Sequence, residues 1–261
     1  MRNFYIAPVL MRDVLREAGL SGQVQQAMEW FSGVGEVKTA PKAPGMDIDA
    51  FNTSLMGRVA SLLMLEDSPY KWAYLKALSR WIDNGFKYVD GTRPCFKTDG
   101  SIYPHRRAYP AYAVGGLDGA VNSVWMLRGT ALAVSEESHE ILKHALLEMR
   151  FWCNLRSFPL AMSGRHPDGK GELSPKHFAM LAEAGAPDGS SPLDTALASA
   201  FMRLVPDAGV KEKVWLRKFG ESGIAPEPTP QGSRSYGYNC SLSHRSGEAL
   251  VTIAGHSRYL W

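Results

Sequence analysis

Residues 68–86 read SPYKWAYLKALSRWIDNGF. Ser68 followed by Pro69 is a typical helix start, because the hydroxyl caps a free N–H group and proline suits the first helical turn. Apolar side chains then recur at steps of three and four as far as Phe86. The stretch therefore predicts a helix with one buried face.

The same spacing continues on both sides of this helix. Residues 48–66 follow Asp47, a candidate cap, and are expected to pair with residues 68–86 as a helical hairpin. Serial hairpins without an exact repeat indicate a solenoid or a toroid of paired helices. Further helices are expected at about residues 116–127, from Ser135 to Trp152, and more weakly near 4–18, 22–32, 175–185, 192–204 and 209–219, with Ser174-Pro175 and Ser191-Pro192 as two of the starts.

The composition changes after residue 220. Residues 222–233 are rich in Pro, Gly and Ser, which is typical of a linker. Residues 236–243 and 248–254 are typical of two strands joined by a turn at 244–247. We therefore expect a mainly α protein with a helical domain over 1–221, followed over 222–261 by a linker and the first strands of a β-domain.

Composition excludes several classes of protein. The 261 residues are 45% hydrophobic and 21% charged, enough to bury a core, and a net charge of +3 is too mild to indicate nucleic acid. Three separate cysteines form neither a disulfide framework nor a zinc motif. No apolar run is long enough to span a membrane, and the first residues lack the features of a secretory signal.

One loop carries unusual chemistry. Residues 99–112, DGSIYPHRRAYPAY, fit neither helical nor strand periodicity, and the last ten contain three Tyr, two Arg and one His. Two prolines stiffen this loop, which lowers the entropy lost when its side chains are held in place. The composition suits a site for a sugar acid. It suits equally a loop that packs its tyrosines on helices and leaves its arginines in water.

A second irregular segment follows the helix that ends near residue 152. Within residues 154–169, Gly164-Arg165-His166-Pro167 presents a guanidinium and an imidazole beside a flexible glycine. Arg165 is a candidate anion clamp, since arginine binds carboxylate or sulfate through two parallel hydrogen bonds. The alternative is an ion pair with Asp168 that only fixes the loop.

Together the two segments resemble chondroitin sulfate ABC lyases of polysaccharide lyase family 8. The family's Lys/Arg-x-Asp-Gly turn, histidine, and Tyr-Pro-x-Tyr motif are matched by Lys97-Thr98-Asp99-Gly100, His105 and Tyr109-Pro110-Ala111-Tyr112. Residues 160–167, LAMSGRHP, are similar to its Leu-Ala-Gly-Arg-His-Pro segment. Pro104 and Arg106 depart from the basic and acidic residues that flank the histidine in the family.

The resemblance implies an incomplete (α/α) toroid followed by antiparallel β-sandwich domains. It assigns the catalytic positions to His105, Tyr112 and Arg165. The expected substrate-binding residues are Arg106, Arg107, Tyr109 and His166. An essential family glutamate would come after Trp261, so the chain resembles the central piece of a longer enzyme.

Such lyases cleave the C4–O4 bond of a uronic acid by β-elimination and leave a 4,5-unsaturated uronate. Arg165, helped by His166, would neutralise the carboxylate that makes the C5 proton hard to remove. His105 would accept that proton or hold the uronate carboxylate, since histidine has a reference pKa of about 6.5. Tyr112 would protonate the leaving oxygen or act as the base, the choice depending on whether the uronate is glucuronic or iduronic.

The expected partner is an acidic polysaccharide: chondroitin sulfate, dermatan sulfate or hyaluronan. Neither nucleic acid nor a membrane is expected as a partner. No cofactor is required and no metal-binding residues are assigned; a divalent cation is possible but not indicated. The full-length parent would be secreted or periplasmic, although this chain shows no signal peptide.

Two other functions remain open from the sequence. A non-catalytic module that binds glycosaminoglycans is favoured by the missing glutamate. A glycoside hydrolase needs two carboxylates beside a cleft, and the two loops offer only Asp99 and Asp168.

Overall fold

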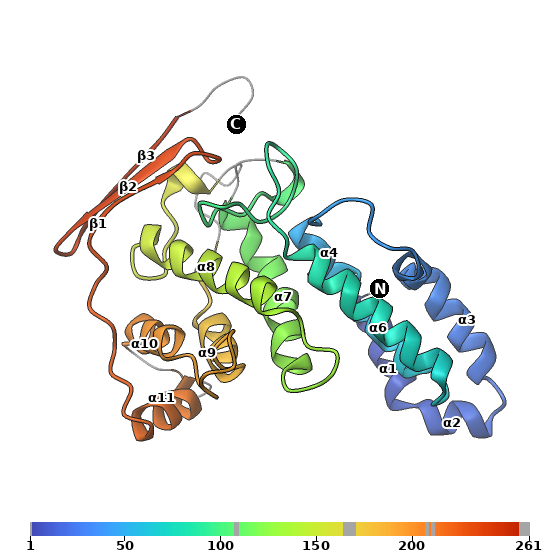
Figure 1. The fold of residues 1–261 in the computed structure, drawn as a ribbon. Coiled ribbons are helices and arrows are strands. Elements are labelled where there is room, and N and C mark those ends of the chain that lie inside the picture. Colours follow the sequence, from blue (N-terminus) through green and yellow to red (C-terminus); the bar gives the residue numbers. More distant parts are fainter. Residues whose placement is uncertain (1, 107–109, 164–170, 207–208, 210–211, 256–261) are drawn as a thin grey trace.

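A computed structural model of the chain describes residues 2–106, 110–163, 171–206, 209 and 212–255. Helices make up most of this part, and a three-stranded antiparallel sheet follows them (Figure 1). The α-helices are α1 Ile6–Leu10, α2 Arg12–Glu17, α3 Ser21–Ser32, α4 Ile48–Thr53, α5 Leu55–Leu63, α6 Pro69–Gly85, α7 Val114–Leu127, α8 Glu136–Trp152, α9 Pro175–Glu183, α10 Thr195–Leu204 and α11 Glu212–Glu221. Short 3₁₀ helices are η1 Arg2–Tyr5, η2 Val34–Lys38, η3 Pro104–Arg106, η4 Pro110–Ala113 and η5 Leu160–Met162, and the strands are β1 Gly232–Tyr236, β2 Ser241–Ser246 and β3 Ala249–Ala254.

The predicted capping residues start the main helices. The side chains of Asp47, Ser68 and Ser135 accept hydrogen bonds from backbone N–H groups in the first turns of α4, α6 and α8. Pro175 begins α9 as predicted, although the side chain of Ser174 makes no capping hydrogen bond. Local sequence therefore sets where most of these helices begin.

Three helix predictions were wrong in their bounds. Residues 48–66 form two helices, α4 and α5, divided at Ser54, and residues 4–18 form η1, α1 and α2. The expected start at Ser191-Pro192 is also wrong, because the Ser191 hydroxyl bonds to backbone groups of Leu193. Helix α10 begins three residues later, where the Asp194 carboxylate accepts a hydrogen bond from the Leu197 N–H.

The strand prediction also needs correction. The chain forms three strands in the order β1-β2-β3, and β1 begins inside the expected linker, at Gly232. Residues 237–240, expected inside a strand, form the turn between β1 and β2. Cys240 has a positive φ of 48° there, which a continuous strand does not allow. Arg245, expected in a turn, lies in β2 opposite Gly232.

One hydrophobic core joins α4–α11 and extends to Tyr236 of β1. A smaller cluster packs the N-terminal helices onto α5 through Tyr5, Met28, Ala60 and Met64. In Figure 1, α1–α6 lie at one end of the molecule and the sheet lies at the other, with α7 and α8 between them and α10 and α11 below the sheet. Among the described residues, no helix combines the length and apolarity needed to cross a membrane.

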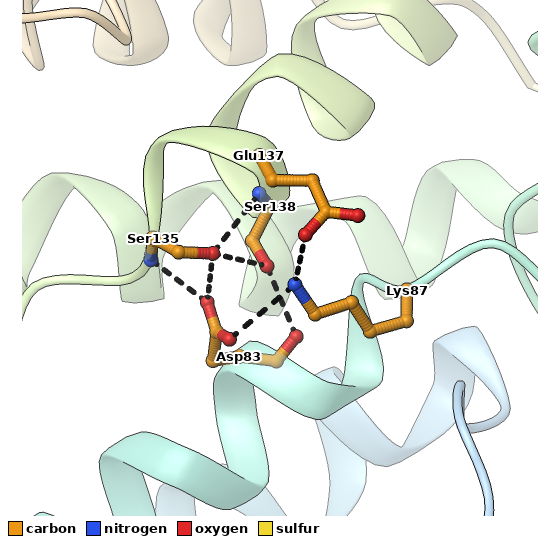
Figure 2. Close-up of polar contacts among 5 residues, drawn as sticks. All are labelled: Asp83, Lys87, Ser135, Glu137 and Ser138. Carbon is orange, nitrogen blue, oxygen red and sulfur yellow. Dashed lines mark hydrogen bonds and ion pairs between the residues drawn. The ribbon is translucent and has the colours of Figure 1, made fainter.

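Helices α6 and α8 are joined by polar contacts at the start of α8 (Figure 2). Asp83 of α6 accepts hydrogen bonds from the Ser135 N–H and hydroxyl, both at 2.7 Å. Partial burial of Asp83 raises the pKa of its carboxyl, but the hydrogen bonds from Ser135 outweigh burial and leave the pKa lowered. Lys87 lies 2.5 Å from Glu137 and 3.8 Å from Asp83, which closes the network.

The sheet docks on the end of α8. Arg245 of β2 is 3% exposed and donates to the carbonyl oxygens of Phe151 and Cys153. The hydroxyl of Tyr236 donates to Glu148 of α8 at 2.9 Å. These buried contacts fix the sheet against the helices and bring the turn at 237–240 near the loop that follows α6.

Candidate active site

The loop at residues 95–106 is built around a buried lysine. Lys97 is fully buried, and its ammonium donates to the carbonyl oxygens of Val89, Gly91 and Arg93 at 3.0, 2.8 and 2.6 Å. Burial lowers the pKa of this ammonium. The carbonyl oxygens replace its lost water and fold the segment after α6 around it.

The predicted Lys-x-Asp-Gly turn is a turn in the structure. The Gly100 N–H donates to the Lys97 carbonyl at 3.0 Å, and Asp99 accepts from the Ser101 N–H at 2.9 Å. Gly100 has a φ of +80°, and a Cβ added there would lie 2.5 Å from Glu148. Glycine is needed at this position for both reasons.

The loop delivers His105 to the start of α4. Its Nδ1 atom lies 3.3 Å from Oδ2 of Asp47, and its Nε2 atom lies 3.0 Å from Oδ2 of Asp49. The His105 backbone N–H also donates to Oδ2 of Asp47 at 2.7 Å. Both nitrogens of one imidazole therefore face carboxylates from a single helix start.

His105 adopts a backbone conformation that few residues other than glycine use. Its φ and ψ are 52° and 31°, in the left-handed region. Such conformations are held by surrounding contacts and cluster at functional sites. The imidazole is 47% exposed, so a ligand can reach it from solvent.

Tyr112 lies beside His105 on the approach to α7. The two ring centroids are 5.2 Å apart, with the rings tilted by 55°. The Tyr112 hydroxyl lies 3.5 Å from Oδ2 of Asp49, the oxygen that also faces His105. The two predicted catalytic residues in this part of the chain thus meet at one carboxylate.

Close packing of α7 on α4 brings these groups together. A Cβ on Gly119 would lie 2.1 Å from the Phe51 carbonyl oxygen, and one on Gly116 would lie 2.5 Å from the Ile48 carbonyl oxygen. The two helices approach this closely only because both positions are glycine. The start of α7, with Tyr112 before it, is thereby held at the start of α4.

The site places an imidazole, a phenol and two carboxylates side by side. An imidazole and a phenol can each donate or accept a hydrogen bond. The arrangement can therefore hold a polar ligand and exchange a proton with it.

Asp47, Asp49 and His105 are also the described residues best placed to hold a metal ion. One ligand atom from each lies within 4.8 Å of the others. Carboxylate and imidazole ligands in this number suit several divalent metals. The sequence-based prediction assigned no metal-binding residues, and nothing in the geometry requires a metal.

Five of the predicted site residues cannot be placed in full. Arg107, Tyr109, Arg165 and His166 lie outside the described residues. Arg106 is described only in its backbone, as the last residue of η3. The roles expected for these five residues stay predictions.

Sequence reasoning missed Asp49 and saw Asp47 only as a cap. The cap prediction was correct, since Oδ1 of Asp47 accepts from the Asp49 N–H at 3.1 Å. The one available signal was a pair of carboxylates, two residues apart, at a helix start. Nothing in the sequence says that this start lies against a loop 58 residues further along.

An open cavity of about 680 Å³ lies elsewhere, along α8. Its wall includes Glu136, Glu137 and Glu140, with Lys143 and His144. Three carboxylates disfavour a polyanion at this place. The site at His105 stays the candidate site because the predicted residues His105 and Tyr112 meet there.

Comparisons show which known proteins the chain is similar to. Residues 1–211 match a family model described as "Lyase, catalytic". The chain is 45% identical over 276 residues to a chondroitin sulfate ABC exolyase of Bacteroides thetaiotaomicron, with 100% of this chain and 27% of that protein covered. It is 32% identical to a chondroitin sulfate ABC exolyase of Proteus vulgaris (99% and 26% covered) and 29% identical to an ABC endolyase of Proteus vulgaris (100% and 25% covered). The chain thus spans about a quarter of the length of these relatives.

Proposed function

The chain belongs to the lyase catalytic-domain family, and from this premise we propose that it supplies the proton-transfer groups of a glycosaminoglycan lyase. The proposed reaction is β-elimination at a uronic acid of chondroitin sulfate or dermatan sulfate, with hyaluronan as a further substrate to test. One observation carries the proposal: His105 and Tyr112 lie side by side and share the carboxylate of Asp49.

The reaction removes a proton from C5 and breaks the bond between C4 and O4. The C–H electron pair at C5 becomes the C4=C5 double bond, the C4–O4 pair leaves on oxygen, and that oxygen takes up a proton. An unsaturated uronate and a new hydroxyl group result. A base at C5, a proton donor at O4 and a group that neutralises the uronate carboxylate are sufficient.

We assign the proton transfers to His105 and Tyr112 as a pair. In the imidazolium form, His105 donates to the uronate carboxylate, and Tyr112, after losing its own proton to solvent, takes the C5 proton as a phenolate and then gives that proton to O4. When the C5 hydrogen lies on the opposite face, a neutral His105 is the base and Tyr112 the donor. The 5.2 Å between the rings lets one sugar ring meet both groups.

The charge around the site assigns a role to the arginines. Asp47 and Asp49 with an imidazolium leave one net negative charge, which repels a uronate. Arg165 in the clamp position, with Arg106, Arg107 and His166, would supply the opposing charge, and Tyr109 would contact the sugar. The match of residues 1–211 to the family model supports these assignments.

We further propose that the helical hairpins belong to an incomplete (α/α) toroid and that the three strands open a β-sandwich. Residues 1–221 would be the helical domain, and residues 222–261 the linker and first strands. A polysaccharide substrate suits a secreted or periplasmic parent protein. Full-length coverage of the chain by three lyase relatives supports this placement.

Cleavage is tested by incubating an excess of the chain with tetrasaccharides of chondroitin sulfate, dermatan sulfate and hyaluronan. Excess protein makes even one slow turnover visible. We expect ultraviolet absorbance from a conjugated uronate with the chondroitin and dermatan substrates. His105→Ala should slow its appearance by about 100-fold or more, the usual contribution of a positioned proton-transfer group.

The same experiment separates a lyase from a binding module. Salt-sensitive binding of chondroitin sulfate with no conjugated product would contradict the proposal and indicate a module that only binds the polysaccharide. Product formation that is unchanged in His105→Ala would contradict the site assignment while leaving lyase activity in place.

A further inference from the structure

The turn between β1 and β2 contacts the loop that carries His105. The Tyr103 hydroxyl donates to the Tyr238 carbonyl at 2.7 Å, and the Asn239 side-chain amide donates to the Ser101 hydroxyl at 2.9 Å. The Tyr238 N–H donates to Oδ2 of Asp99 at 3.2 Å. We call these three hydrogen bonds the turn–loop seam.

Two side chains of the seam are buried. Tyr103 is 1% exposed and Asn239 is 6% exposed. The buried ammonium of Lys97 lies 4.8 Å from the ring centroid of Tyr103 and 5.1 Å from that of Tyr238. The Tyr238 hydroxyl also donates to Asp90 at 3.0 Å, before the loop begins. The turn therefore holds the loop at Asp99, Ser101 and Tyr103.

His105 lies two residues after Tyr103 in the loop. The segment from 104 to 106 is a single short 3₁₀ turn, and His105 within it has a left-handed backbone. The direction of the imidazole therefore depends on contacts with neighbouring residues. On one side Asp47 and Asp49 hold the imidazole. On the other side the nearest fixed point is the seam at Tyr103.

We propose that Tyr103 and Asn239 are positioning residues that set the place of His105 through the turn–loop seam. The sheet then contributes to the active site although none of its described residues contacts His105. The expected effect on turnover rests on the proposed function. The expected effect on the position of His105 does not. A misplacement of about 1 Å in a catalytic group lowers turnover by about 100-fold.

A merely structural role must be separated from positioning. Tyr236 offers the matched control, because its ring is also 1% exposed and its hydroxyl also joins the sheet to the helical part. Its partner is Glu148 on α8, not a residue of the loop. Tyr103→Phe and Tyr236→Phe each remove one buried hydroxyl from the same interface, and only the first acts on the seam.

The test uses the full chain with Tyr103→Phe, Asn239→Ala and Tyr236→Phe. The first readout is the NMR signal of the His105 imidazole in ¹³C-labelled protein, assigned with His105→Ala. We expect this signal to shift in Tyr103→Phe and Asn239→Ala and to stay in place in Tyr236→Phe. The second readout is cleavage, where we expect kcat about 10- to 100-fold lower with KM within about twofold in the first two variants only.

Several results would overturn the inference. An unmoved His105 signal in both seam variants would do so, as would an equal shift in Tyr236→Phe, which would show general loosening of the sheet. If Tyr103→Phe lowers the melting temperature more than Tyr236→Phe does, in parallel with its larger loss of kcat, the loss of kcat reflects lower stability and not the placement of His105. If the chain cleaves nothing, the proposed function fails, and the NMR signal still decides the positioning role.

Discussion

Asp49 joins the two residues expected to move protons. Its Oδ2 atom faces the His105 imidazole at 3.0 Å and the Tyr112 hydroxyl at 3.5 Å. Asp49 therefore contacts both side chains and orients them. The geometry of the candidate site therefore depends on Asp49, a residue that the family resemblance did not assign to it.

Asp49→Asn should slow cleavage by about 10- to 100-fold, because an amide of the same shape no longer holds the imidazole and phenol by charge. Single-turnover absorbance measures this change. Asp13→Asn serves as the control, since Asp13 pairs only with the exposed Arg16 among its described contacts. Equal rates in wild type and Asp49→Asn would show that Asp49 has no part in the site.

At the residue scale, the sequence predicted His105 and Tyr112 as a catalytic pair because both lie in one short segment with a recognisable spacing, and the structure places their rings side by side. It could not identify Asp49, whose role arises when α7 packs against α4. The role of Asn239 is likewise set by a turn more than 130 residues from the loop it contacts. Contacts of this kind depend on tertiary packing, and local patterns carry no record of them.

Helices α4 and α7 are the elements that assemble the site. Their approach depends on Gly116 and Gly119, which have no room for a side chain. Capping signals fixed the starts of α4, α6 and α8 in advance because they act within one turn of helix. The break at Ser54 and the turn at 237–240 were missed, because apolar spacing continues through both.

Gly119→Ala should destabilise the fold by about 1–3 kcal/mol, because its methyl group would overlap the Phe51 backbone. It should also slow cleavage by moving Tyr112 away from Asp49. Gly115→Ala is the matched control in the same helix, where an added Cβ meets nothing within 4 Å. That change should stabilise the protein by about 0.5–1 kcal/mol in chemical denaturation. Equal stabilities for the two variants would contradict the packing account.

The joint between α8 and α10 should respond to pH. Burial lowers the pKa of His139 from 6.5 to about 4, against a smaller opposing effect of Asp194. Between pH 6.5 and 4, the unfolded chain therefore binds a proton at His139 that the folded chain does not bind. The resulting stability is fully present above pH 6.5 and is lost as pH falls toward 4, by an amount of the order of 3 kcal/mol.

Urea unfolding of wild type and His139→Gln at several pH values measures this effect. The difference in their free energies of unfolding should change between pH 6.5 and 4 and stay constant from pH 7 to 8. A difference that does not depend on pH would show that His139 is protonated equally in both states.

At the scale of the whole molecule, the chain combines a mainly helical part with a sheet whose β1–β2 turn contacts the loop that carries His105. Composition and periodicity predicted the mainly helical class and the change after residue 220. They could not predict that the sheet would dock through Arg245 and the 237–240 turn, since both were expected in other local structures. The site is thus completed by an element far along the chain from His105.

The most direct test of the account is a double-variant cycle on His105 and Tyr112. Single-turnover cleavage of chondroitin sulfate tetrasaccharide is measured by conjugated-uronate absorbance in wild type, His105→Ala, Tyr112→Phe and the double variant. Because the two groups act as one unit, we expect each single variant to lose about 100-fold or more and the double variant to lose little beyond that. Losses that simply multiply, or a double variant as fast as wild type, would contradict a shared proton-transfer site at Asp49.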